Sequence, residues 1–374
     1  MKVERIELSL LYLPYVHHFE TSFGREEGRS FIIVRVFSEG LCGYGEVVAS
    51  EAPLYSYETT STAWLILSEF LIPIIFKKKI SRPEDFYWEA RRYRGHPMAK
   101  AGLELALWDL QSKKAGVPLA RFYGGTRDEV SVGVSLGIED TIKELLRRIE
   151  FFLGEGYKRI KIKIKPGWDI EVVREVRRQF PDIALQVDAN GAYSLKDKEA
   201  LRMLDEFNLL MLEQPFPPYD LWDHSRLQRE MKTPLCLDES IISEDTARQA
   251  LEMKSCQVIN IKVGRVGGMV EVRKIHDLCR REGIPVWCGG MLESGIGRAH
   301  NLHIASLPNF KLPSDLSASK RYYKEDIIDP PIELGKDGKI PVPTGPGIGV
   351  NPVEDRIKRA TIREEVFEPD QGIL

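Results

Sequence analysis

Five charged side chains recur along the chain at nearly equal intervals. Lys163, Asp188, Glu213 and Asp238 follow one another by 25 residues each, and Lys262 follows Asp238 by 24. Each of them comes at the end of a short apolar run, and the interval suits one strand followed by one helix. In a parallel barrel these residues would stand at the same height, at the carboxyl ends of five consecutive strands, where barrel enzymes hold their chemistry.

The three carboxylates in this series predict a metal site. Asp188, Glu213 and Asp238 would converge from adjacent strands, repel one another and raise at least one carboxyl pKa unless a cation joined them. The set offers oxygen ligands without histidine or cysteine, which favours a hard divalent ion. We therefore expect Mg²⁺ as the cofactor, with Mn²⁺ or another divalent ion as an alternative. The competing interpretation is a purely structural cluster.

The two lysines flank these acids, Lys163 on the strand before them and Lys262 on the strand after. Around a barrel they would face a metal-bound ligand from opposite sides, so that one could remove a proton and the other return it. The pKa of lysine, ~10.4 in peptides, must fall by about three units for this role near neutrality. The metal and the cations Lys161, Lys165 and Arg265 are expected to lower it.

The segment Arg159–Lys165 reads RIKIKIK, which puts isoleucines on one strand face and four cations on the other. An edge strand with its lysines in solvent would show the same pattern. In a closed parallel barrel both faces of a strand are buried, so the cations would line the interior. On this interpretation Lys163 is the base, Lys161 supports it or contacts a substrate carboxylate, and Lys165 reaches solvent.

The elements around these residues form a repeating pattern. From about Glu129 onward, a short apolar run, a turn and an amphipathic helix alternate about eight times, which predicts a parallel barrel. The first 125 residues mix alternating strands with helices, and the tail returns to strand and turn chemistry. The expected division is 1–125 for an α+β capping domain, 126–320 for the catalytic barrel and 321–374 for a segment that returns to the cap.

Composition excludes several kinds of partner. The 374 residues include 53 basic and 56 acidic side chains, a net charge of −3, and no basic run is interleaved with aromatics, so no nucleic-acid partner is expected. The longest apolar run, from Trp64 to Phe76, is short for a membrane span and contains Glu69. The N-terminus alternates like a strand and lacks the apolar region of a signal peptide. These features predict a cytoplasmic protein that acts on small molecules.

Other residues with possible chemistry give weaker signals. The five cysteines are scattered, form no CxxC pair and are expected to be reduced thiols. His300 and His303 could share a metal, but surface or core histidines are the favoured interpretation. The GRVGG segment at Gly264–Gly268 is a weak nucleotide signal and is more typical of a tight strand-to-helix turn.

The two lysines and three acids resemble the site of the enolase superfamily, muconate-lactonizing-enzyme subgroup. The pairing of lysine bases with Mg²⁺ is already known in that superfamily. Within it the chain is similar, over nearly its whole length, to the o-succinylbenzoate synthases that are also N-succinylamino-acid racemases. The segments that carry this similarity are GYGE, ALWDL, RIKIKIKPGWD, VDANGAYS, LEQP, CLDES, INIKVGRVGG and WCGGMLESGIGRAHN.

The resemblance implies a fold and a set of residue roles. The fold is α/β, a (β/α)₇β TIM-like barrel with an α+β capping domain formed by the N-terminal region and the C-terminal tail. The acid/base pair is Lys163 and Lys262, and a homo-oligomer is a family expectation. The Mg²⁺ ligands are Asp188, Glu213 and Asp238.

The resemblance also suggests how the substrate is enclosed. Loops 21–25 and 52–57 would close over it, although ordinary surface loops have the same composition. GGMLESG would present backbone groups and Met291 to it, or else bury Met291 in the core. Asn190 and Glu239 each adjoin a metal ligand and would support it, or else cap the following helix.

Two reactions follow from the resemblance, and both pass through one enolate. One is racemisation of an N-acylamino acid, with a lysine on each face. The other is a dehydration that forms o-succinylbenzoate for menaquinone synthesis, with Lys163 as base and Lys262 kept charged. Alternatives are a dipeptide epimerase or muconate cycloisomerase, an imine-forming lysine aldolase, and a non-catalytic metal-binding protein. Because Arg25, Glu26 and Glu27 make the first loop unusually charged, the substrate's side chain is left open.

Overall fold

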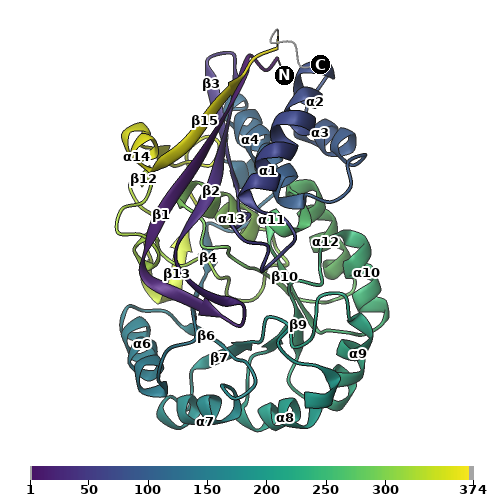
Figure 1. The fold of residues 1–374 in the computed structure, drawn as a ribbon, viewed down its shortest axis with the longest axis vertical. Helices are drawn as coiled ribbons and strands as arrows, with labels where there is room; N and C mark the ends of the chain where they lie inside the picture. The colour runs from purple at the N-terminus through teal and green to yellow at the C-terminus, as the bar shows by residue number, and fades with distance from the viewer. Residues whose placement is uncertain (1, 370–374) are drawn as a thin grey trace.

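The alternating residues near the N-terminus form long antiparallel strands, because one face of each can pack on a core while the other meets solvent. The computed structural model describes residues 2–369. The strands are β1 (Arg5–Thr21), β2 (Gly24–Ser38) and β3 (Leu41–Val47). The C-terminal strand β15 (Thr361–Phe367) pairs with β1, giving the order β15-β1-β2-β3. The tail therefore returns to the cap, as predicted (Figure 1).

Helices cover this sheet to complete the cap. The long α4 lies against β3, where missing side chains allow a close approach: a Cβ on Gly45 would lie 2.0 Å from the carbonyl oxygen of Gly102. The cap helices are α1 (Thr60–Ile66), the π-turn η1 (Leu67–Leu71), α2 (Ile72–Lys77), α3 (Pro83–Ala90), α4 (Pro97–Lys114) and α5 (Leu119–Tyr123).

One helical segment within residues 2–369, Thr60–Lys77, is apolar and long enough to cross a membrane. Half of it is buried, and its buried apolar side chains, including Trp64 and Leu71, belong to the core between the cap sheet and its helices. A core helix passes the same test of length and composition, and the packing of this one matches that explanation.

The alternating pattern after residue 129 forms a parallel sheet of seven strands with the order β11-β10-β9-β8-β7-β6-β5. The strands are β5 (Gly133–Leu136), β6 (Arg159–Lys163), β7 (Ala184–Asp188), β8 (Leu212–Glu213), β9 (Leu235–Leu237), β10 (Val258–Ile261) and β11 (Val286–Cys288). Their helices are α6 (Ile142–Gly154), α7 (Ile170–Gln179), α8 (Lys198–Arg202), α9 (Leu221–Glu230), α10 (Glu244–Glu252), α11 (Val263–Val266), α12 (Met269–Arg281) and α13 (Gly295–Ala305). In Figure 1, α6 to α10 ring the end of the barrel away from the cap. The predicted α/β fold, a capped barrel, is confirmed.

The eighth apolar run closes the barrel without becoming a regular strand. Phe310 forms an isolated parallel bridge with Val286, and Ser314 forms another with Val132. Backbone bonds at Asp315 and Gly133 complete this closure on both sides. The run contains Pro313, which lacks a donor for the ladder, and this accounts for its irregular backbone.

The rest of the C-terminal segment lies against both the barrel and the cap. β13 (Lys339–Pro341) pairs with β4 (Glu129–Ser131), and β12 (Ile328–Asp329) pairs with β14 (Asn351–Pro352). The remaining elements are the 3₁₀ turns η2 (Leu195–Asp197), η3 (Met203–Phe207), η4 (Ser319–Arg321) and η5 (Lys336–Gly338), and helix α14 (Glu354–Ala360).

The weaker sequence signals are structural. His300 and His303 are buried and bond backbone groups, His300 with the carbonyl of Tyr44 and His303 with the amide of Ala120, so the core interpretation is confirmed. GRVGG forms α11 and the turn after it, with Gly267 at φ +93° in the left-handed region. All five cysteines are free thiols.

A buried acid joins the cap to the barrel and should make stability depend on pH. Glu104 of α4 accepts bonds from the amide of Val270, 2.9 Å away, and from the indole of Trp108, 3.1 Å away. Burial nevertheless raises its pKa from 4.5 to about 8. A raised carboxyl pKa means that ionisation opposes folding, so stability is lost progressively as the pH rises from about 4.5 to about 8.

Replacing this acid by an amide should therefore stabilise the protein at alkaline pH. The pKa shift corresponds to at most about 5 kcal/mol, and we expect Glu104→Gln to gain melting temperature relative to wild type between pH 6 and pH 9. Thermal unfolding at both pH values measures the gain. Glu150→Gln, on the exposed side of α6, is the control and should follow wild type. Parallel behaviour of Glu104→Gln and wild type would contradict the prediction.

Candidate active site

The barrel brings the five regularly spaced residues together. Lys163 pairs in register with Asp188, and Asp188 with Glu213, at the carboxyl ends of β6, β7 and β8. Asp238 directly follows β9, and Lys262 directly follows β10. All five are buried, as equal height inside a closed barrel requires.

The three acids form one compact cluster. Asp188, Glu213 and Asp238 each offer a carboxylate oxygen, and these oxygens lie within 4.8 Å of one another. Glu213 accepts bonds from the amides of Gln186, at 2.8 Å, and Asn260, at 2.7 Å. Burial raises the pKa of Glu213, with the charge of Asp188 adding to the effect. Burial also opposes ionisation of Asp188, but nearby lysines outweigh it and lower the pKa of that carboxyl.

The two lysines stand at opposite ends of the acid row. Lys163 Nζ donates to Asp188 Oδ2 at 2.7 Å and to Asn190 Oδ1 at 2.6 Å. Lys262 Nζ lies 2.8 Å from Asp238 Oδ2 and 4.4 Å from the ring centroid of Tyr55. The amines are therefore separated by the carboxylates, which is the arrangement that proton transfer on two faces requires.

The neighbouring cations do not act as the sequence suggested. Lys161 Nζ lies 2.9 Å from Glu213 Oε2 and 2.5 Å from Asp315 Oδ2. Arg265 donates to Asp238 through its guanidinium. Each cation thus pairs with an acid instead of facing Lys163 or Lys262. Burial lowers the pKa of Lys262, but the surrounding Tyr55 and carboxylates outweigh it and raise the pKa. The lowering of the Lys262 pKa that the sequence suggested is therefore not found in this arrangement.

Asp315 is a member of the network that the sequence pattern missed. It lies on the irregular eighth run and pairs with Arg159, 2.6 Å away, as well as with Lys161. Burial opposes its ionisation, yet these two cations lower its pKa to about 2. Its only sequence signal was its place at the end of FKLPSDL, the weakest of the strand runs. Arg159 and Lys161 do line the interior, so the edge-strand interpretation of RIKIKIK is wrong.

Asn190 and Glu239 lie beside the lysines, as the supporting role requires. Asn190 accepts from Lys163 and donates to Glu239 Oε1 at 2.8 Å. The residues that cap the elements following β7 and β9 are Ser194 and Ser243, so the alternative of helix caps is wrong. Asn190 Oδ1 therefore fixes the position of the Lys163 amine.

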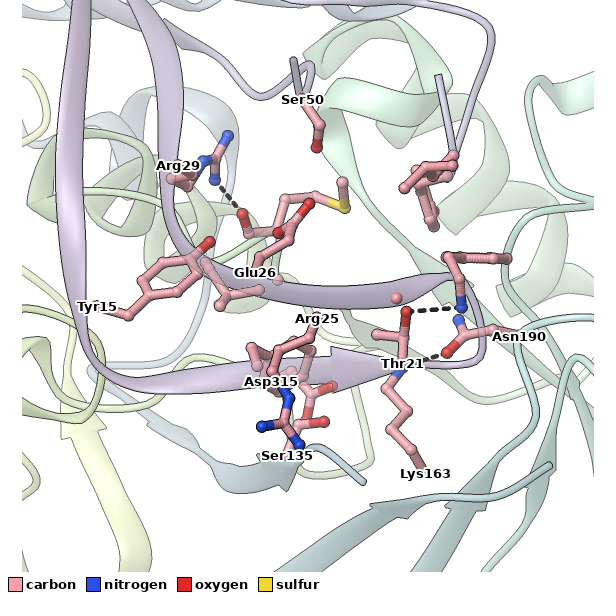
Figure 2. A pocket seen from close by; sticks show the side chains of 18 of the residues that line it. Tyr15, Thr21, Arg25, Glu26, Arg29, Ser50, Ser135, Lys163, Asn190 and Asp315 are labelled. Carbon is pink, nitrogen blue, oxygen red and sulfur yellow. Dashed lines mark hydrogen bonds between the residues drawn. The ribbon is translucent and has the colours of Figure 1, made fainter. Parts of the chain in front are cut away.

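The two predicted loops cover this site. Figure 2 shows the β1–β2 hairpin crossing over Lys163, with Glu26 and Tyr15 directed toward the pocket. Arg25 at the hairpin tip pairs with Asp140, 2.5 Å away in the loop after β5. Lys165 has a side chain that is 40% exposed and lies 3.5 Å from Glu20. The hairpin is thus fastened to the barrel beside the pocket.

Two further contacts bring the cap to the site. Tyr55, in the second predicted loop, donates to Asp238 Oδ1 at 3.0 Å. Arg29 of β2 donates to the carbonyl of Met291, which lies in the GGMLESG segment and lines the pocket. Met291 is half-buried, and it both packs against the core of the cap and lines the pocket. The sequence analysis placed Tyr55 in a loop over the site but missed its hydrogen bond to Asp238. Tyr55 belongs to the cap and Asp238 to the barrel, and the two residues are far apart in sequence.

The donor set fits a hard divalent ion. Three buried carboxylates within 4.8 Å offer oxygen ligands only. Among residues 2–369, Asp238 Oδ2 is a buried oxygen that accepts no hydrogen bond. Burying such an oxygen costs free energy unless a positive charge faces it. Lys262 Nζ supplies one such charge by an ion pair, and a metal ion among the three acids would supply another. The acids would therefore hold the ion, and Lys163 and Lys262 would remain on either side of it.

The fold and these residues define the class of protein. Residues 7–124 match the family described as mandelate racemase / muconate lactonizing enzyme, N-terminal domain, and residues 144–356 match the enolase C-terminal domain-like family. The chain belongs to this family of enolase-superfamily enzymes, and the resemblance predicted from the motifs is confirmed.

Individual members of this family are similar to the chain over nearly its whole length. The chain is 50% identical over 368 residues to o-succinylbenzoate synthase from Geobacillus kaustophilus, covering 98% of both chains. It is 47% identical over 362 residues to N-succinylamino acid racemase from Thermus thermophilus, covering 97% of this chain and 98% of that protein. A solved structure of an enolase-superfamily member from Listeria innocua superposes with a TM-score of 0.95 at 41% identity, covering 99% of this chain and 100% of that chain.

The Tyr55 hydroxyl should matter more for rate than for metal binding. Its bond to Asp238 orients a carboxylate from outside the acid cluster, and loss of such a partner costs roughly 10- to 100-fold in activity or affinity. We expect Tyr55→Phe to lower turnover of an N-succinylamino acid about tenfold while Mg²⁺ still binds. Steady-state kinetics and Mg²⁺ titration measure both effects. Tyr57→Phe, in the same loop and 58% exposed, is the control. Unchanged turnover in Tyr55→Phe would contradict this role.

Proposed function

We propose that this enzyme abstracts a proton α to the carboxylate of a small substrate, with Mg²⁺ as cofactor. The activity is that of an N-succinylamino-acid racemase, an o-succinylbenzoate synthase, or both. The observation that carries the proposal is the placing of Lys163 and Lys262 at opposite ends of one buried cluster of acids. The relatives named above support the choice of these two reactions among those of the superfamily.

The proposed roles follow from the contacts. Asp188, Glu213 and Asp238 hold the Mg²⁺, which supplies positive charge to stabilise the enolate as it develops. Lys163 and Lys262 hold or move protons at their Nζ atoms, one on each face of the substrate carbon. When a lysine gives up its proton, the acids beside it lose a charge partner, so the lysines and the acids act as one coupled set.

The remaining polar groups position these atoms. Lys161 and Arg265 pair with Glu213 and Asp238 and hold these carboxylates in place. Asn190 fixes the amine of Lys163, and Glu239 in turn fixes Asn190. Met291 and the hairpin residue Phe19 line the pocket and exclude water from it. The substrate itself is a small-molecule carboxylate that lies between the cap and the barrel.

Broader expectations accompany this activity. A role for the synthase reaction in menaquinone synthesis, a cytoplasmic location and a homo-oligomeric assembly are part of the proposal, and neither nucleic acid nor membrane is among the proposed partners. The neutral overall balance of charge supports the preference for small ligands. The proposed division of the chain remains 1–125, 126–320 and 321–374.

The first test is NMR of N-succinyl-L-phenylalanine with the enzyme in D₂O. We expect the α-proton signal to disappear when Mg²⁺ is present, optical rotation to fall toward zero, and EDTA to stop both. A parallel assay with the synthase substrate follows formation of the aromatic product. Failure of both substrates with Mg²⁺-loaded protein would overturn the proposed function.

The same experiments separate the alternatives. A dipeptide epimerase would act on dipeptides in preference to N-succinylamino acids. An imine-forming aldolase would be trapped by borohydride and be indifferent to EDTA. A non-catalytic metal-binding protein would bind Mg²⁺ and exchange no proton. The buried acids beside both lysines favour metal-assisted proton transfer, because an imine-forming lysine has no need of three carboxylates.

A further inference from the structure

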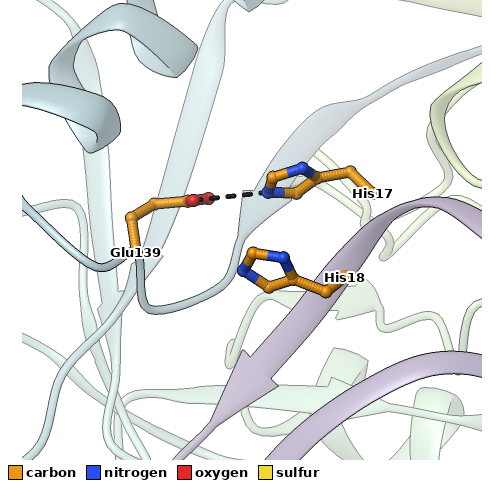
Figure 3. Close-up of side chains that lie close together, drawn as sticks. All are labelled: His17, His18 and Glu139. Carbon is orange, nitrogen blue, oxygen red and sulfur yellow. Dashed lines mark hydrogen bonds and ion pairs between the residues drawn. The ribbon is translucent and has the colours of Figure 1, made fainter.

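A second group of metal-type ligands lies outside the active site. His17, His18 and Glu139 each offer a ligand atom, and these atoms lie within 4.8 Å of one another. His17 Nε2 is 3.3 Å from Glu139 Oε2. Figure 3 shows both imidazoles on the same side of their strand, facing Glu139 across a gap between two elements.

This arrangement depends on an irregularity in β1. Successive strand residues normally point to opposite faces. The pairing of β1 with β2 shifts between Pro14 and Phe19, and within this stretch the two histidine rings stack with their centroids 4.2 Å apart. A bulge of this kind re-aims side chains, and here it sends two adjacent imidazoles toward one point.

The carboxylate of the cluster is oriented toward the histidines. His17 Nε2 lies 3.3 Å from Glu139 Oε2. Glu139 has a side chain that is 5% exposed, and its Oε1 lies 2.9 Å from Arg148 Nε, which leaves Oε2 directed at His17. A carboxylate ligand is commonly oriented by such a second partner.

One atom of the cluster is without a partner. His18 Nε2 is buried and forms no hydrogen bond with any residue from 2 to 369. A buried ring nitrogen without a partner carries the cost of desolvation unless something binds it. The side chain of His17 is 32% exposed, so an ion can reach the cluster from solvent.

We propose that His17, His18 and Glu139 form a second metal site, which takes a transition-metal ion of the Zn²⁺ type and fastens the hairpin to the barrel. Two imidazoles and one carboxylate are a ligand set that suits Zn²⁺ and leaves a position for water. The set differs from the all-oxygen cluster in the barrel, which favours Mg²⁺. The two sites should therefore select different ions.

The position of the site gives it a function. The histidines lie on β1, a few residues before the hairpin that crosses the active-site pocket, whereas Glu139 lies in the loop after β5. Existing contacts already hold the hairpin to this loop, the pair of Arg25 with Asp140 and the bond from the amide of Ile138 to the carbonyl of Glu20. A bound ion would add a further fastening, and restrained opening of the hairpin would slow substrate exchange.

The positive charges near the cluster limit its affinity. Arg148 contacts Glu139 directly, and Arg321 and Arg25 contribute charge at His17. These cations oppose a dication, so we expect binding weaker than at a structural zinc site with four protein ligands.

The test is a Zn²⁺ titration by calorimetry of protein already saturated with Mg²⁺. We expect wild type to bind one Zn²⁺ per chain more than His18→Ala or Glu139→Gln. Affinity at this site should fall in both variants by more than the roughly 10- to 100-fold that follows loss of an outer partner. Any replacement of Mg²⁺ by Zn²⁺ in the barrel should occur equally in wild type and variants, so it does not affect the difference in Zn²⁺ binding between them. His96→Ala, a partly exposed histidine elsewhere, is the matched control.

Hydrogen–deuterium exchange tests the fastening. Zn²⁺ should slow exchange of residues 19–26 in wild type and in His96→Ala, and leave it unchanged in His18→Ala. Glu139→Gln, which keeps the shape of the side chain, separates loss of a ligand from a failure to fold. Equal Zn²⁺ binding by wild type and both variants would overturn the site. Binding without slower exchange of the hairpin would overturn its fastening role.

Discussion

A Lys262→Ala variant is expected to lose racemisation of N-succinylamino acids by roughly 10²- to 10⁴-fold while still exchanging the α-proton of one enantiomer. Lys262 and Lys163 lie at opposite ends of the acid cluster, so in the proposed mechanism each would reach one face of the substrate carbon. With Lys262 removed, Lys163 can still take a proton and return deuterium to the same face. NMR in D₂O with each enantiomer, combined with optical rotation, distinguishes exchange with retention from racemisation.

The reciprocal variant and a matched control sharpen this prediction. Lys163→Ala should retain exchange with the other enantiomer, because Lys262 faces the opposite side. Lys165→Ala changes a lysine two residues from Lys163 whose side chain is 40% exposed and pairs with Glu20, and it should keep racemase activity. Loss of exchange with both enantiomers in each single variant, with Mg²⁺ still bound, would mean that the lysines do not divide the two faces.

A Glu213→Gln variant is expected to lose Mg²⁺ binding and to lower proton exchange by about 10³-fold or more. Glu213 is fully buried at the centre of the acid row and accepts from Lys161, Gln186 and Asn260. An amide there removes one negative charge and turns one acceptor atom into a donor, which conflicts with the donors already facing it. Calorimetric titration with Mg²⁺ and the D₂O exchange assay measure the two losses.

Asp315→Asn is the matched control for this change. Asp315 is also a buried acid bonded to Lys161, but it lies outside the cluster of three. Its loss leaves the buried Arg159 without a carboxylate partner, whereas Lys161 keeps Glu213, so we expect a destabilisation of about 3 to 5 kcal/mol with Mg²⁺ binding retained. Loss of Mg²⁺ binding in a folded Asp315→Asn protein, or retained binding in Glu213→Gln, would contradict the assignment of ligands.

Much of the barrel could be predicted because periodic sequence maps directly onto periodic structure. The interval between Lys163, Asp188, Glu213 and Asp238 repeats because each strand–helix unit has nearly the same length. Equal intervals then place side chains at equal heights, whichever helices intervene. The alternation in RIKIKIK likewise assigned each side chain to a face before any contact was known.

Other parts of the site depend on where unrelated segments meet, and periodicity carries no information about that. Asp315 reaches Lys161 only because an irregular run closes the barrel between β11 and β5. Tyr55 reaches Asp238 only because the cap docks on the barrel, which joins residues 183 positions apart in sequence. The same holds for Glu139 and His17, whose meeting requires both this docking and a bulge in β1.

The tertiary structure also determined which charged side chains form ion pairs. The sequence suggested that the charges of Lys161 and Arg265 act on Lys163 and Lys262, yet in the barrel each of these two cations pairs with a carboxylate. In a buried interior a cation is stable only beside an opposite charge, so packing selects these pairs over like-charged neighbours. By itself the sequence determined the βα repeat, the acids and the lysines, because these depend on local spacing. Only the tertiary structure decided which charges pair and what closes the pocket, because those depend on contacts between distant segments.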